Sequence, residues 1–173
     1  MRITASDEKI HPNFRMREFL SKDPSLKNGH DLSDKVIEAI FWLREYYDSE
    51  IRINSTARGE IYNAMVGGSR GSYHVKGRAI DFSFKSEEAR AEFEEDIMNQ
   101  GYAFLNLRKK GISGFGIYKN FFHLDDRESN CRSEDKYGRF QVWKEKEVFT
   151  WIRRSYPVAL LGLGVIFLLF SQS

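Results

Sequence analysis

A chain of 173 residues is long enough for one domain with a hydrophobic core, and its length gives no reason to expect two. Hydrophobic residues at 41% argue against wholesale disorder, and a net charge of +2 with Lys and Arg mixed among Asp and Glu argues against a nucleic-acid partner. The single cysteine, Cys131, excludes an internal disulfide and a thiolate zinc site, so any metal must be held by histidines and carboxylates.

The N-terminal third predicts two helical segments. Residues 1–10 mix charges and lack the basic start and apolar run of a secretory signal, so we expect no signal peptide. Residues 14–20 have the pattern of a short helix. Ser33 is then placed to cap a helix that reaches about Tyr47, because apolar residues recur there at three- and four-residue spacing.

The middle of the chain predicts strands around a glycine-rich loop. Residues 51–54 alternate as a short strand, and residues 78–84 alternate strictly, with Ile80, Phe82 and Phe84 on one face. Asp81 is therefore expected to point away from the apolar face. Ser86 can cap the helix that follows, and Gly101 is expected to end it.

The last part of the body predicts a hairpin and then an irregular stretch. Residues 115–125 form two short strand patterns joined at Lys119 and Asn120, a polar pair able to make a tight turn. Residues 126–146 are charged and irregular in pattern, and their strong packing anchors are Phe140, Val142 and Trp143. We predict one α+β domain over residues 1–146, with a core of about 14–143, a small antiparallel sheet and flanking helices.

Residues 147–173 are expected to be a linker followed by a C-terminal hydrophobic helix. Residues 156–170 are uncharged and apolar, but a helix of that length covers only about 22 Å, short of the roughly 30 Å of a bilayer core. Two alternatives stay open, a membrane anchor and a buried or interfacial helix. Arg153 and Arg154 on its N-terminal flank would favour a cytoplasmic domain if the segment spans a membrane.

The residues suited to chemistry lie in two segments. His74 sits in a glycine-flanked loop before Asp81, and alternation in FFHLDD puts His123 and Asp125 on one strand face. Two imidazoles and one carboxylate suit a single Zn²⁺ ion with a fourth position for water, which is the arrangement that metal-assisted hydrolysis needs. The remaining histidines, His11 and His30, are expected to be ordinary surface or core residues.

Three segments together resemble a known family. Residues 72–81 carry the complete pattern S-x-H-x-x-G-x-A-x-D. It resembles the signature of the M15 family of zinc peptidases, the D-alanyl-D-alanine carboxypeptidase and endolysin group, which shares its fold with Hedgehog signalling domains. Residues 54–69 resemble the family's S-x-Y-R and V-G-G segments, with Ala57 where an aromatic is commoner, and residues 114–127 resemble its G-x-G-x-Y…F-V-H-x-D segment.

The resemblance implies roles for particular residues. It makes His74, Asp81 and His123 the zinc ligands, and Arg58 the arginine that binds a substrate carboxylate or steadies the carbonyl oxygen, with a surface ion pair as the alternative. Ser72 would contact the substrate or a ligand, or else cap its own loop.

The general base is where the chain departs from the family pattern. Carboxypeptidases and many endolysins of the family have Glu or Asp three residues before the last histidine, where this chain has Asn120. An amide cannot accept a proton from water, so Asp125 is the candidate base, with orientation of a zinc-bound histidine as its competing role. Asp126 is expected to face away.

The sequence supports two functions. The first is a zinc peptidase, carboxypeptidase or endopeptidase, that cuts the peptidoglycan stem or cross-bridge, in phage lysis or cell penetration. The second is a non-catalytic zinc-binding module of a virion or membrane. The expected location is a membrane, through the C-terminal segment, or the host cytoplasm or virion.

Overall fold

The structure, a computed structural model, describes residues 1–127 and 141–144. The elements before the central sheet are β1 (Arg2–Ile3), β2 (Lys9–His11), β3 (Phe14–Arg15), the 3-10 helices η1 (Met16–Phe19) and η2 (Pro24–Leu26), β4 (His30–Asp31) and α1 (Asp34–Tyr46). They are followed by β5 (Ile51–Ser55), α2 (Glu60–Met65), β6 (Ala79–Phe84), α3 (Glu87–Asn99), α4 (Tyr102–Lys109), β7 (Gly114–Ile117), β8 (Phe122–Asp125) and β9 (Gln141–Lys144).

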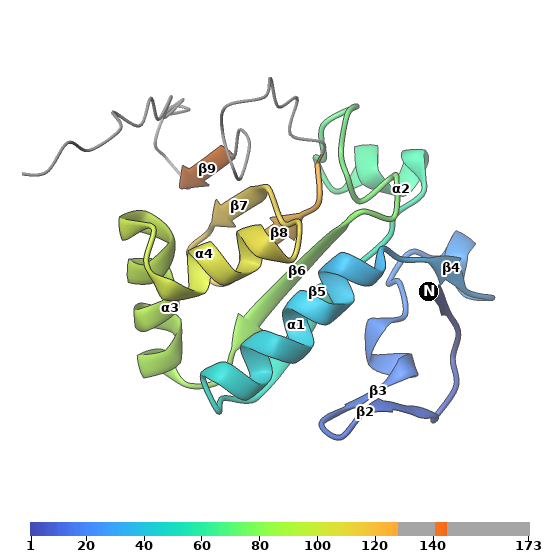
Figure 1. Ribbon diagram of the computed structural model, residues 1–173. Helices are drawn as coiled ribbons and strands as arrows, with labels where there is room; N and C mark the ends of the chain where they lie inside the picture. The colour runs from blue at the N-terminus through green and yellow to red at the C-terminus, as the bar shows by residue number, and fades with distance from the viewer. Residues whose placement is uncertain (128–140, 145–173) are drawn as a thin grey trace, which may run out of the picture.

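A small mixed sheet forms the centre of the fold (Figure 1). Its strand order is β5-β6-β8-β7-β9, and every neighbouring pair is antiparallel except β7 and β9, which run parallel at one edge. Two further pairs, β1 with β4 and β2 with β3, lie in the N-terminal part. The predicted α+β mixture of a small sheet and helices is confirmed, but the parallel β7–β9 pair departs from the antiparallel sheet that was expected.

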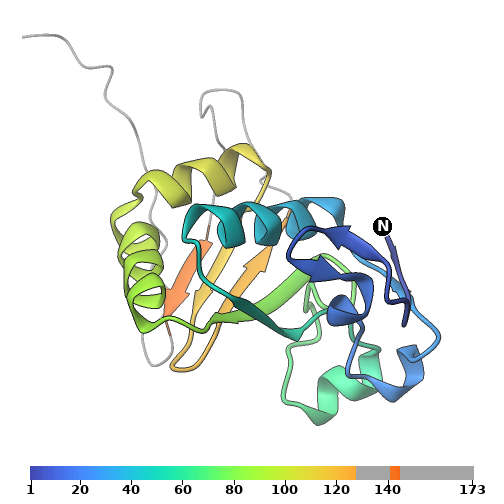
Figure 2. The ribbon, with the colours of Figure 1, turned by 90° about the horizontal axis from the view of Figure 1, so that it is seen from below.

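The hydrophobic core lies between the sheet and helices α1, α3 and α4. Figure 2 shows α1 and α4 lying along one face of the sheet. Alternation along β6 and β8 turns Phe82 and Phe122 into this layer, where both are fully buried. The Phe93 ring of α3 lies 4.8 Å from Phe122 and 5.7 Å from Phe82, centroid to centroid, so aromatic packing fixes α3 against the sheet.

Helix α1 forms where the spacing predicts it, but Ser33 does not act as expected. The backbone of Ser33 leaves the helix as an N-cap residue, yet its hydroxyl makes no capping bond. It donates instead to Asp126 Oδ2 at 2.6 Å, across 93 residues of sequence. The start of α1 is therefore tied to the end of β8.

Helix α3 confirms one predicted boundary and shifts the other. The Ser86 hydroxyl accepts the backbone N–H of Ala89 at 3.2 Å, as expected of an N-cap. The helix ends at Asn99, and Gln100 rather than Gly101 adopts the left-handed conformation, with φ of 54°.

Residues 14–20 are not the continuous short helix expected from their pattern. Phe14 and Arg15 are extended and pair with β2, because His11 and Phe14 are register partners. One 3-10 turn, η1, then follows and buries Phe19.

Several elements were not predicted from the sequence, including the short strands β1, β2 and β4 and the 3-10 helix η2 in the N-terminal part. Helices α2 and α4 were not assigned, and β9 lies within residues 126–146, which were expected to be irregular throughout. The expected C-terminal hydrophobic helix and the linker before it lie outside the described residues. Across residues 1–127 and 141–144, none of the helices combines the length and apolar character needed to span a bilayer.

Candidate metal centre

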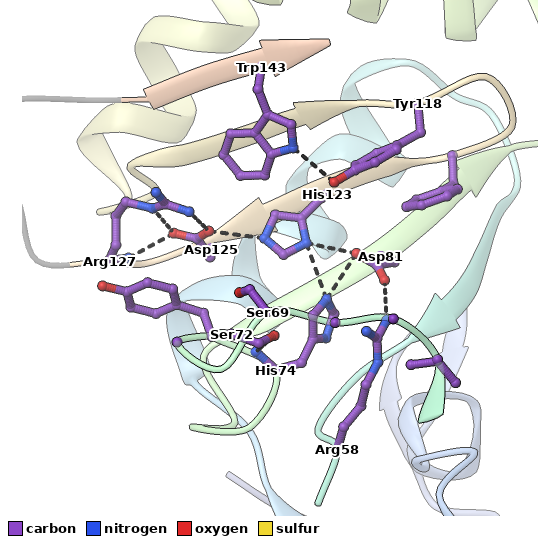
Figure 3. Close-up of a pocket in the computed structure, with 16 residues that line it drawn as sticks. Arg58, Ser69, Ser72, His74, Asp81, Tyr118, His123, Asp125, Arg127 and Trp143 are labelled. Carbon is purple, nitrogen blue, oxygen red and sulfur yellow. Dashed lines mark hydrogen bonds and ion pairs between the residues drawn. The ribbon is translucent and has the colours of Figure 1, made fainter. Parts of the chain in front are cut away.

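Three side chains with metal-binding atoms meet on the sheet face opposite the aromatic core (Figure 3). Asp81 of β6 and His123 of β8 are register partners, so both point to the same side of the sheet. His74 comes from the loop between α2 and β6. Its Nε2 lies 3.0 Å from Asp81 Oδ1 and 3.1 Å from His123 Nδ1, and the last two atoms are 2.8 Å apart.

The loop that carries His74 is fixed by main-chain contacts. The backbone N–H of Arg58 donates to the carbonyl of His74 at 3.0 Å, and Gly77 donates to the same carbonyl at 3.1 Å. Gly77 has φ of +64° and lies so close to the Asp31 carbonyl that a Cβ would clash there, so the turn requires glycine. The glycine of the motif therefore has a local steric reason.

Each of the three groups is also held through its other polar atom. His74 Nδ1 donates to the Thr56 carbonyl at 2.5 Å, and His123 Nε2 donates to Asp125 Oδ2 at 2.9 Å. Arg58 Nη2 donates to Asp81 Oδ2 at 2.7 Å. These contacts direct His74 Nε2, His123 Nδ1 and Asp81 Oδ1 towards one another, and once the two ring nitrogens carry no proton all three atoms offer lone pairs to a metal ion.

The triangle of donor atoms fits a tetrahedral metal ion. Zinc bonds of about 2.0–2.1 Å place neighbouring ligand atoms about 3.3 Å apart, close to the separations observed here. His74, Asp81 and His123 are all buried, and within the described residues they are the histidine and carboxylate group able to hold such an ion. The three residues named from the sequence are thus brought together.

Electrostatics favour an ionised Asp81. Burial alone would raise its pKa, but hydrogen bonds from His123 and His74 outweigh burial and hold the pKa well below its usual range. Burial alone would lower the pKa of His123, yet its contacts with Asp125 and Asp81 raise it. Asp81 can therefore act as a negatively charged ligand, whereas a metal ion must displace the proton that His123 holds.

The Asp125 carboxylate is held in place by hydrogen bonds and an ion pair with Arg127 as well as by its contact with His123. Arg127 donates to Asp125 Oδ1 from Nε at 2.7 Å and to Oδ2 from Nη2 at 2.5 Å, and the Asp125 side chain is fully buried. Burial would raise the pKa of Asp125, but Arg127 and His123 lower it to about 2. A carboxylate with this pKa is a weak proton acceptor, so its contacts favour the orienting role over the role of base.

Two glycines of β7 make space for this network. Gly114 and Gly116 are register partners of Asp125 and His123, so any side chains would point into the site. A Cβ on Gly114 would clash with the Asp125 carboxylate, and one on Gly116 would lie 2.8 Å from atoms of both Trp143 and Tyr118. The glycines therefore let the Asp125 carboxylate and the two rings lie over the strand.

Comparison with known families gives a single clear result. The sequence model described as Peptidase M15 matches residues 12–125, which include α1, β5 to β8 and all three metal-binding candidates. The chain belongs to the Peptidase M15 family. No curated protein matches the chain in a sequence search. Members of the family are zinc peptidases, so the family and the geometry agree on the kind of site.

The M15 peptidase site opens into a pocket of about 610 Å³. Arg58 and Ser72 line it, and the Ser72 hydroxyl also accepts the His74 N–H at 3.3 Å, so it stabilises its own loop. The opposite wall holds residues that the sequence reasoning did not select, namely Tyr118, Arg127 and Trp143. Only Tyr118 had a signal in the sequence, the G-x-G-x-Y spacing, which puts it on the same face as the two glycines.

The remaining candidates lie away from the M15 peptidase pocket. Asn120 is in the β7–β8 turn and lines a different, smaller cavity with Arg90 and Phe122. Asp126 turns from the site, as expected, and accepts from Arg78 Nε at 2.6 Å. His11 stacks on Phe41 at 4.4 Å, and His30 is buried in the N-terminal part, so neither joins the metal-binding group.

Proposed function

We propose that this M15 peptidase holds one Zn²⁺ ion between His74, Asp81 and His123 and uses it to hydrolyse peptide bonds. The observation that carries the proposal is the convergence of three donor atoms whose partner atoms are already held by Thr56, Arg58 and Asp125. Such outer contacts fix the tautomer and direction of ligating histidines. A random cluster of buried polar groups would not have them in all three cases.

The residues of the chain then have distinct tasks. When bound, zinc supplies a water of lowered pKa and polarises the carbonyl under attack. Asp125 orients His123, and Arg58 orients Asp81 while its side chain also faces the pocket. The Arg58 guanidinium has further N–H groups, so it can still contact a substrate oxygen.

The proposed substrate is the peptide of peptidoglycan, in the stem or the cross-bridge. Support comes from the resemblance of residues 54–69, 72–81 and 114–127 to the carboxypeptidase and endolysin group. We further propose that it acts during phage lysis or cell penetration, with the apolar residues 156–170 at a membrane, because the resemblance includes endolysins. Carboxypeptidase and endopeptidase activities are both compatible with the pocket.

Digestion of purified peptidoglycan tests this proposal. The full chain is incubated with sacculi after loading with zinc, after chelation and after zinc is restored, and soluble muropeptides are identified by mass spectrometry. We expect new peptide termini that require zinc. Stoichiometric zinc binding without any new terminus would refute the peptidase function on this substrate.

One feature favours a second candidate, a non-catalytic zinc-binding module. Within the described part of the pocket, Asp81 and Asp125 are the carboxylates, and both are engaged with arginines. A site without an available base would bind zinc and ligand without turnover. The sacculus experiment separates the two, because such a module would bind zinc and leave all muropeptides unchanged.

A further inference from the structure

The direction of one hydrogen bond in the pocket wall is fixed by chemistry. Trp143 Nε1 lies 2.9 Å from the Tyr118 hydroxyl oxygen, and an indole N–H can only donate. Tyr118 must therefore be the acceptor, and its own O–H hydrogen is directed elsewhere. Among the residues that the structure describes, no protein group accepts that hydrogen.

The Tyr118 hydroxyl belongs to the same pocket as the metal-binding group. Tyr118 directly follows β7, two residues after Gly116, the register partner of His123, and its side chain lines the same pocket as His123. Trp143 of β9 is the register partner of Gly116 on the other side, and its ring lies 5.3 Å from the His123 ring. Figure 3 shows Trp143 and Tyr118 together above His123 and Asp81.

Both rings are held in place before any substrate binds. The Tyr118 ring stacks on Phe121 at 4.3 Å and 8°, and Arg90 of α3 donates to the Tyr118 carbonyl at 3.0 Å. The Trp143 ring contacts the Arg127 guanidinium at 5.0 Å. A hydroxyl positioned in this way loses little conformational freedom when it donates to a substrate.

Arg58 is less available for the same task. Its Nη2 donates to Asp81 at 2.7 Å and its Nε donates to Ser55 at 2.9 Å, so two of its donor positions serve the protein. We propose that Tyr118 donates a hydrogen bond to the oxygen of the carbonyl under attack, and that Trp143 positions the Tyr118 hydroxyl for this bond. The inference rests on the proposed peptidase function and adds a catalytic residue and a positioning residue to it.

The matched variants Tyr118→Phe, Trp143→Phe and Tyr102→Phe test the two roles in the full zinc-loaded chain. Tyr118→Phe removes only the hydroxyl, so we expect kcat to fall by about 10²–10³-fold with KM and zinc affinity unchanged. Trp143→Phe should give a smaller loss, and no further loss when combined with Tyr118→Phe. Tyr102→Phe changes an exposed ring outside the pocket and should behave as wild type.

A binding measurement complements the rates. A phosphinic pseudopeptide of the bond identified from the muropeptides mimics the charged oxygen that develops during hydrolysis, whereas a product peptide does not. Tyr118→Phe should weaken phosphinate binding by a factor similar to its loss in kcat and leave product binding unchanged. Equal rates and equal phosphinate affinity for Tyr118→Phe and wild type would overturn the Tyr118 role alone. A wild-type chain that binds zinc but cleaves nothing would overturn both proposals.

Discussion

The two faces of strands β6 and β8 have opposite chemistry although both faces belong to the same two pleated strands. One face carries Phe82 and Phe122, which pack against Phe93 of α3. The other carries Asp81 and His123, which meet His74. The apolar face is completed by helices, whereas the polar face is completed by a loop and by hydrogen bonds.

This difference indicates a division of labour between stability and chemistry. The aromatic face removes large rings from water, which is the main favourable contribution to folding. The polar face gathers buried charges, which stabilise little by themselves and become useful when a cation joins them. Substitutions on the two faces should therefore have separable effects.

The largest effect is expected for Asp81→Ala. Loss of the carboxylate removes one metal-binding atom and the partner of both histidines, so zinc affinity should fall by about 10³-fold or more. Isothermal titration with zinc measures this loss, and circular dichroism should show the fold intact. Asp48→Ala is the control, because the Asp48 side chain is almost fully exposed. Unchanged zinc affinity in Asp81→Ala would contradict the assigned centre.

Phe122→Ala should lower stability and leave zinc affinity unchanged, the reverse of Asp81→Ala. Phe122 is buried against Phe93 and Phe82, so its removal should lower the free energy of unfolding by about 3–5 kcal/mol. Zinc affinity of the folded fraction should remain near wild type. Urea unfolding gives the stability, and Ile61→Ala, at an exposed position of α2, should change it by less than about 0.5 kcal/mol. A stable Phe122→Ala chain would show that this face does not carry the core.

Asp125→Asn distinguishes the two roles left open for this residue. If Asp125 orients His123, the neutral amide should weaken zinc binding by about 10–100-fold, and turnover at saturating zinc should largely recover. If Asp125 is the base, turnover should vanish at full zinc occupancy. Competition with a fluorescent chelator measures the affinity, and rates at high zinc decide between the outcomes.

A smaller, graded effect is expected from pH. Asp125 and Asp81 raise the pKa of His123, so in the metal-free chain its ring keeps a proton above the usual histidine range. Zinc needs the neutral ring, so affinity should rise by up to about tenfold per pH unit until His123 is deprotonated, with release of a proton. Isothermal titration calorimetry with zinc in buffers of different ionisation enthalpy measures the number of protons released on binding. An affinity that is constant between pH 6 and 8 would contradict this sign.

The sequence predicted the parts of the fold that local pattern encodes. Strict alternation around Asp81 and His123 was enough to place both on the polar face, and the Ser86 cap followed from its position. Helix α2 has no apolar stripe towards the core, since Ile61 and Met65 are about four-fifths exposed, so periodicity could not reveal it.

The parts that were missed depend on contacts between distant residues. Strand β9 pairs with β7 across more than twenty residues of sequence. The charged residues around β9 interrupt the apolar alternation that would have predicted a strand. The Ser33 hydroxyl binds Asp126 rather than its own helix for the same non-local reason. Arg127 and Trp143 lie beyond the residues that the family pattern matches, so no motif could assign them to the pocket.

The two histidines of the centre differ in how readily mutation can adjust them. His74 is aimed by the carbonyl of Thr56, a main-chain atom that every residue type would supply. His123 is aimed by the Asp125 side chain, which one nucleotide change can replace. Among descendants of this chain, mutations that change metal affinity should therefore occur at Asp125, which orients His123. Substitutions of Thr56 should change the affinity less, because the carbonyl that orients His74 remains.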